Sequence, residues 1–179
     1  MKIFILLPLI ALSVSVAIAR DGAHDQAQIN ARTTTTSSLL CDYQIIVRTG
    51  DVAYAGTDAI ISLELAGADG TMLSIKDLAS WGNNGPGYNY FERGNTDKFI
   101  YTANCMNPKP CKMLLESDNS GNNPGWYVDY IKVIQLRTFF TPVSHMFKVN
   151  QWLAKDESPY QLNAYRDDCS LLLGVTAMA

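Results

Sequence analysis

Oxygen-bearing side chains gather in two short segments whose chemistry suits a cation. One segment is Gly56-Thr57-Asp58, which comes directly before a predicted strand, and the other holds Asn89, Glu92 and Asp97 within nine positions. Carboxylate, amide and hydroxyl oxygens suit a hard cation such as Ca²⁺, which takes about six to eight oxygen ligands. The same residue types also form ordinary turns, because Asp and Asn side chains bond their own backbone. From spacing alone, a calcium site and plain turns both remain open.

Trp81 stands apart from the other two tryptophans because it lies in a glycine-rich loop, residues 78–87. An aromatic side chain on such a loop can sit at a membrane interface, where its apolar ring and polar edge are both accommodated. The alternative is a ring that folds back over the edge of the protein core. Trp81 is therefore a candidate membrane-contact residue, with the folded-back position kept open.

Catalytic residues are hard to place in this sequence. It has two histidines, His24 and His145, and neither stands beside a recognisable nucleophile motif. We find no Gly-x-Ser-x-Gly elbow, no His-Glu-x-x-His pair and no glycine-rich phosphate loop. The sequence therefore predicts a protein that is not an enzyme.

Four cysteines indicate disulfides and an oxidising compartment. Cys41 opens the predicted folded body and Cys169 closes it, while Cys105 and Cys111 flank a short proline-containing turn. Four cysteines allow three pairings. We favour Cys41–Cys169 with Cys105–Cys111. A zinc site is disfavoured, because there is no Cys-x-x-Cys pair and no nearby histidine.

The N-terminus has the layout of a cleaved secretory signal peptide. Lys2 precedes an apolar run that ends in the small-x-small sequence Ala17-Ile18-Ala19. We expect a signal peptide over residues 1–19, a flexible Thr/Ser-rich leader over 20–40, a folded body over 41–169 and an apolar tail over 170–179. The predicted location is therefore the secreted space or the endoplasmic reticulum.

The charge balance is mildly acidic, with a formal net charge of −3. No run of basic residues exceeds two neighbours along the chain. Nucleic-acid binding therefore has no electrostatic basis, and a polybasic membrane attachment is not expected. A negatively charged protein is repelled by anionic lipid, so membrane attachment should depend on apolar insertion or on a bridging cation.

Short alternating segments, separated by Gly, Asn, Pro and Asp turns, predict an all-β fold after the leader. In one of them Ile61, Leu63 and Leu65 share a face. Such spacing is typical of an antiparallel sandwich. The predicted strands are residues 43–49, 58–65, 71–75, 98–103, 112–117, 126–136, 146–152 and 161–165.

Several of these motifs, in this order, resemble the PLAT/LH2 domain family, and in particular its small stress-associated plant members. The resemblance runs from Cys41 to Cys169 and rests on these segments: 43–50 (YQIIVRTG), 55–58 (AGTD), 85–95 (GPGYNYFERGN), 125–127 (GWY) and 151–156 (QWLAKD). Some plant relatives carry two further cysteines, which would fall near Val128 and Pro142, so this chain has fewer bridges than they do.

The resemblance implies an eight-stranded antiparallel β-sandwich of two four-stranded sheets. It also implies a calcium-ligand set, since calcium-binding members use the two loops named above. Those ligands correspond here to Gly56, Thr57, Asp58, Asn89, Glu92 and Asp97.

Two classes of function follow. The first is a calcium-assisted module that associates with membrane lipid in the secretory pathway, with a role in plant stress response. The alternative is a protein-interaction module that docks an enzyme or a cell-wall component. The sequence names neither the lipid nor the partner, and it leaves the oligomeric state open.

Overall fold

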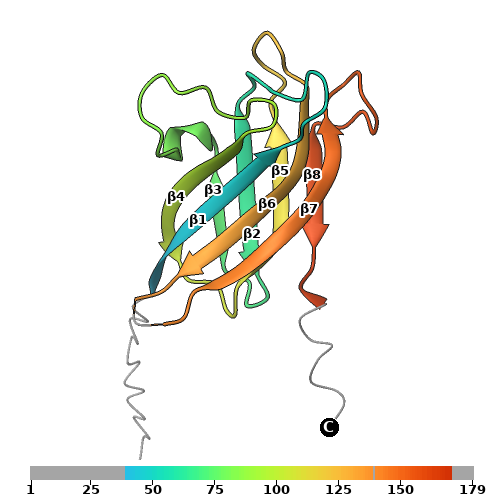
Figure 1. Cartoon of the computed structure of the whole chain (residues 1–179). Helices are drawn as coiled ribbons and strands as arrows, with labels where there is room; N and C mark the ends of the chain where they lie inside the picture. Colours follow the sequence, from blue (N-terminus) through green and yellow to red (C-terminus); the bar gives the residue numbers. More distant parts are fainter. Residues whose placement is uncertain (1–38, 139, 171–179) are drawn as a thin grey trace, which may run out of the picture. The chain divides into compact units, whose positions relative to one another are not determined.

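Eight antiparallel strands form two four-stranded sheets in the computed structural model, which describes residues 39–138 and 140–170. Strand order is β4-β1-β6-β7 in the first sheet and β3-β2-β5-β8 in the second (Figure 1). The strands are β1 (Leu40–Thr49), β2 (Ile61–Gly67), β3 (Met72–Ile75), β4 (Thr96–Asn104), β5 (Pro110–Ser117), β6 (Trp126–Leu136), β7 (Val143–Leu153) and β8 (Asn163–Asp167). A single 3₁₀ turn, η1 (Ala79–Trp81), interrupts them among the described residues. The predicted fold class is confirmed.

Alternation of apolar and polar residues explains the layers, because successive side chains of a strand point to opposite faces. Tyr43, Ile45 and Val47 of β1 are fully buried, and Ile61, Leu63 and Leu65 of β2 face them from the other sheet. Trp126 closes one end of this core, where its indole N–H donates to the Thr49 hydroxyl at 3.0 Å.

Every predicted strand is present, with ends shifted by up to a few residues. The starts of β1, β2 and β7 differ most, by three residues each. Of these, β2 was expected from residue 58 and begins late, at Ile61. The reason is local: the Thr57 hydroxyl accepts from the Ala59 N–H, and the Asp58 N–H donates to the Asn123 carbonyl. These bonds turn the chain before it can join the sheet.

The predicted disulfide pairing was wrong. The bridges are Cys41–Cys105 and Cys111–Cys169, with Cα–Cα distances of 5.0 and 4.8 Å. Strand pairing decides this. Cys105 follows β4, which lies beside β1, the strand that holds Cys41. Cys111 lies in β5, beside β8, and Cys169 follows β8. The short proline-containing stretch crosses from one sheet to the other, so the two cysteines that flank it belong to different sheets.

The predicted signal peptide lies outside the described residues, as do most of the leader and all but the first residue of the tail. Within the described part, no helix is long and apolar enough to cross a membrane.

Candidate functional site

Three loops meet at the upper end of the sandwich in Figure 1. They are the loop between β1 and β2, the loop that precedes β4 and the loop between β5 and β6. Backbone hydrogen bonds join them. The Thr57 N–H donates to the Phe91 carbonyl at 3.3 Å, and the Asp58 N–H donates to Asn123 at 3.1 Å. The Tyr127 N–H also donates to Ala55 at 3.0 Å. The two loops singled out in the sequence are therefore neighbours in space.

Gly56 lets these loops approach closely. A Cβ atom at this position would lie 3.1 Å from the backbone nitrogen of Arg93 and 3.3 Å from the Glu92 Cα. A side chain would therefore push the loop that carries Glu92 away from Asp58.

A hollow of about 410 Å³ opens where the loops meet. Four of the six predicted ligand residues line it, and three further residues complete its wall: Gly56, Thr57, Asp58 and Glu92, with Tyr54, Arg93 and Asn123. Asn123 was not anticipated, although it stands in the Asn-Asn-Pro turn that precedes β6. Its amide nitrogen lies 3.5 Å from an Asp58 oxygen.

The other two predicted ligands do not line this hollow. Asn89 donates a hydrogen bond from its amide to the Glu92 carboxylate and so orients that side chain from outside. Asp97 is completely buried at the start of β4. Its carboxylate accepts from the Phe91 backbone N–H at 2.8 Å and from the Tyr88 hydroxyl at 3.0 Å. Asp97 thus holds residues 88–91 in place from the core side.

Oxygen atoms suit a hard cation, and the hollow offers them from two carboxylates, Asp58 and Glu92, and from the Asn123 amide. The Thr57 hydroxyl is committed elsewhere, since it donates to the Pro124 carbonyl at 3.1 Å. No cluster of three or more His, Cys, Asp or Glu side chains placed to hold a metal occurs among the described residues. The donor set therefore fits calcium in chemical type, with further oxygen ligands needed to complete its coordination.

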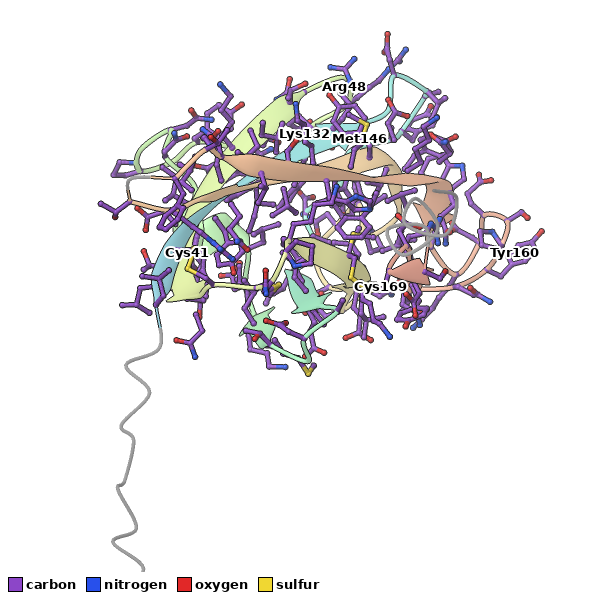
Figure 2. All side chains as sticks on the ribbon, turned by 90° about the horizontal axis from the view of Figure 1, so that it is seen from below. Cys41, Arg48, Lys132, Met146, Tyr160 and Cys169 are labelled. Carbon is purple, nitrogen blue, oxygen red and sulfur yellow. A yellow bond between two sulfur atoms is a disulfide. The ribbon has the colours of Figure 1, made fainter. Side chains whose placement is uncertain are left out.

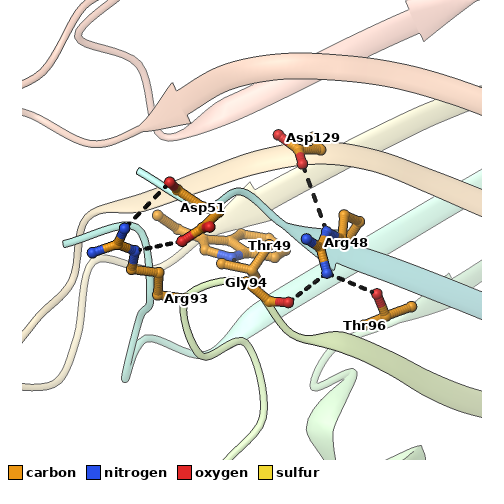
Figure 3. A network of polar contacts seen from close by, with 8 residues as sticks. Arg48, Thr49, Asp51, Arg93, Gly94, Thr96 and Asp129 are labelled. Atoms are coloured by element: carbon orange, nitrogen blue, oxygen red, sulfur yellow. Dashed lines mark hydrogen bonds and ion pairs between the residues drawn. The ribbon is translucent and has the colours of Figure 1, made fainter. Parts of the chain in front are cut away.

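Two arginines stand beside this end of the sandwich (Figure 3). Arg93 donates to the Asp51 carboxylate at 2.8 Å, so its positive charge at the wall of the hollow is compensated. Arg48 donates to the Gly94 carbonyl and, at 3.2 Å, to the Thr96 hydroxyl. These contacts fix the turn between the hollow and β4.

Trp81 ends the 3₁₀ turn η1 beside the β4 edge of the sandwich. Its ring meets Tyr101 edge-on, with 4.5 Å between ring centroids, yet 46% of its surface is exposed. One side of the ring therefore packs on the sandwich while the other faces solvent, and membrane contact by Trp81 stays a prediction.

His145 lies against Asp168, with Nε2 2.8 Å from a carboxylate oxygen, and packs edge-on against Phe147. This pair stands next to the Cys111–Cys169 bridge and away from the loop hollow. It serves to fix the chain after β8 against β7. His24 lies outside the described residues.

The family model described as PLAT/LH2 domain matches residues 43–166. The chain belongs to this family. It is 43% identical over 134 residues to PLAT domain-containing protein 1 of Arabidopsis thaliana, an alignment that covers 74% of each chain. Identity to Lipoxygenase homology domain-containing protein 1 of Mus musculus is 32% over 121 residues, which cover 66% of this chain and 5% of that protein.

Solved structures carry the same fold. A crystal structure of coral 8R-lipoxygenase, described as activated by calcium via a C2-like domain, superimposes with a TM-score of 0.51 at 22% identity. The match covers 70% of this chain and 16% of the lipoxygenase. This PLAT domain is therefore built like the C2-like domain of a much larger enzyme.

Proposed function

We propose that this PLAT protein is a non-enzymatic module of the secretory pathway that associates with membrane lipid, and that calcium assists the association. The observation that carries the proposal is the hollow that the Asp58 and Glu92 side chains both line. A calcium ion held there by two carboxylates would cancel their negative charge and would keep open coordination positions, which a lipid phosphate can fill. Both disulfides suit an oxidising compartment. A role in plant stress response belongs to the proposal and rests on the resemblance to small plant members of the family.

Trp81 would supply the apolar part of the attachment. Its half-exposed ring is connected to the Asn89–Asp97 ligand loop through the glycine-rich segment that follows η1. Tryptophan favours the headgroup level of a bilayer. The proposed contact therefore combines a bridging cation with one inserted aromatic side chain.

Vesicle co-sedimentation with and without calcium tests the proposal. We expect calcium to increase binding to vesicles that contain phosphatidylserine, and Asp58→Ala to abolish that increase. Glu116→Ala is the matched control, because Glu116 is an exposed carboxylate on the second sheet, outside the hollow. A folded Trp81→Ala variant should bind vesicles more weakly than the wild type. Equal calcium responses of the Asp58→Ala variant and the wild type would contradict the site.

A protein-docking module is the alternative, and one observation favours it. The outer face of the second sheet carries a hollow of about 410 Å³ with apolar side chains around it, among them Met72, Leu114 and Tyr165. Met72 is 64% exposed and Tyr165 54%. If the wild type binds no vesicle at any calcium concentration, this alternative becomes the better account.

A further inference from the structure

Strand register brings together lysines that are far apart in the sequence. In the first sheet, Ile46 of β1 is paired with Lys98 of β4 on one side and with Lys132 of β6 on the other. Lys132 is in turn paired with Met146 of β7. Because neighbouring strands lie about 4.8 Å apart, the backbones of the two lysines stand about 10 Å from each other across Ile46.

The adjacent rows continue the pattern. Arg48 is paired with Tyr130, and Tyr130 with Lys148, so a second row holds two more cations. On the other side, Gln44 is paired with Ile100 and with Ile134. We call the resulting surface the cationic face and define it by eight side chains: Arg48, Lys98, Lys132 and Lys148, with Ile46, Ile100, Ile134 and Met146.

These side chains point outward, because the residues that alternate with them along each strand are buried in the core. Val47, Phe99, Val133 and Phe147 are completely buried. On the face itself, Ile100 is 46% exposed and Met146 44%. Figure 2 shows Arg48, Lys132 and Met146 on the same side of the sandwich, and in Figure 1 no described element covers this sheet.

Acidic side chains do little to neutralise the cationic face. Of the three on these four strands, Asp97 is buried in the core and Asp42 lies at the far end of β1, bonded to Thr102. Asp129 approaches Arg48 at 3.8 Å. The three lysines form no ion pair with any described residue. Among the described residues, Asp129 thus offsets one of the four cations, and a chain with a net charge of −3 carries excess positive charge on this side.

We propose that the cationic face binds anionic phospholipid headgroups directly and without calcium. This inference rests on the proposed membrane function and adds a second contact to it. Each lysine or arginine close to an anionic bilayer contributes about 1 kcal/mol, and long lysine stems can lie along the isoleucines while their ammonium groups reach phosphates. The cationic face is broad and spans four strands, which suits a bilayer. An acidic helix would instead require a narrow groove.

The test uses the protein produced from its full coding sequence in a secretory host, so that processing and disulfides are native. Binding is measured in chelator, with vesicles of phosphatidylcholine and phosphatidylserine at about three to one and with pure phosphatidylcholine. We expect the wild type to bind only the mixed vesicles, and to lose that binding as ionic strength rises, because salt screens exposed charges.

The key variant is Lys98→Gln/Lys132→Gln, which removes two charges from the cationic face. It should bind about thirty-fold more weakly in chelator, which corresponds to about 2 kcal/mol. The matched control is Lys76→Gln/Lys112→Gln, which changes net charge equally but alters the second sheet. Those lysines pair with Glu64 and Asp167 at exposed positions, so the control should fold and bind like the wild type.

The outcomes separate this inference from the proposed function. Vesicle binding that appears only with calcium, or equal binding of the key variant and the wild type in chelator, would overturn the cationic face and leave the calcium-assisted function standing. Equal losses in the key variant and its control would also overturn it, since net charge alone would then explain binding. No wild-type binding under any condition would overturn both.

Discussion

Replacement of Asp97 tests most directly how the loops at the upper end of the sandwich are held in place. Its buried carboxylate accepts two hydrogen bonds, from the Phe91 N–H at 2.8 Å and from the Tyr88 hydroxyl at 3.0 Å. Phe91 has a φ of 63°, a left-handed conformation that bulky residues rarely adopt. Its ring packs against Phe99 and Trp126 at centroid distances of 5.5 and 5.0 Å. Asp97 thus secures an unfavourable backbone conformation that the core requires.

The magnitude follows from the two bonds. In Asp97→Ala the Phe91 N–H stays buried without a partner, which costs about 1–3 kcal/mol, whereas the half-exposed Tyr88 can turn to water. Loss of the charge-assisted bond to Tyr88 adds about 1 kcal/mol. We therefore expect the free energy of unfolding to fall by about 3 kcal/mol. Asp97→Asn should lose only about 1 kcal/mol, because its amide oxygen can still accept from Phe91.

Urea unfolding in the presence of chelator measures these values without any contribution from calcium. Tyr88→Phe is the control for the second bond alone and should lose no more than about 1 kcal/mol. If Asp97→Ala is as stable as the wild type in chelator and differs only when calcium is present, Asp97 acts as a metal ligand and its structural role is refuted.

Two further predictions concern cross-links and acid stability. Cys111→Ser/Cys169→Ser opens a cross-link with a sequence separation of 58 and should lower the free energy of unfolding by about 4 kcal/mol in denaturant titrations; a loss below about 1 kcal/mol would argue against this role. Burial tends to raise the pKa of Asp69, but hydrogen bonds from Thr71 and Asn107 hold it below its usual range. The ionised Asp69 carboxylate therefore stabilises the fold above the unfolded-state pKa, and this contribution is lost as pH falls below about 4. Acid titration of Asp69→Asn should show a shallower decline than the wild type, and an identical decline would exclude this contribution.

The sequence anticipated much of the loops at the upper end of the sandwich, but not which of their residues line the hollow and which are buried. The Gly-Thr-Asp turn and the Asn89–Asp97 loop were recognised as two halves of one site, and they are adjacent. That Asp97 faces the core while Glu92 faces the hollow depends on where β4 begins to pair with β1. Asn123 joins the hollow because β6 lies beside β1, and this neighbour relation has no local sequence signal.

Sequence alone determined the strands, because alternation of apolar and polar residues is a local property with a period of two. Ile61, Leu63 and Leu65 show this, since their spacing predicted a shared buried face and all three are buried. Only the tertiary structure decided which strands became neighbours. That choice paired Cys41 with Cys105 and Cys111 with Cys169. It also placed Lys98 and Lys132 on either side of Ile46, so a chain without a basic run carries a basic surface. The physical reason is that register between strands is set by the packing of the whole core, which no short segment contains.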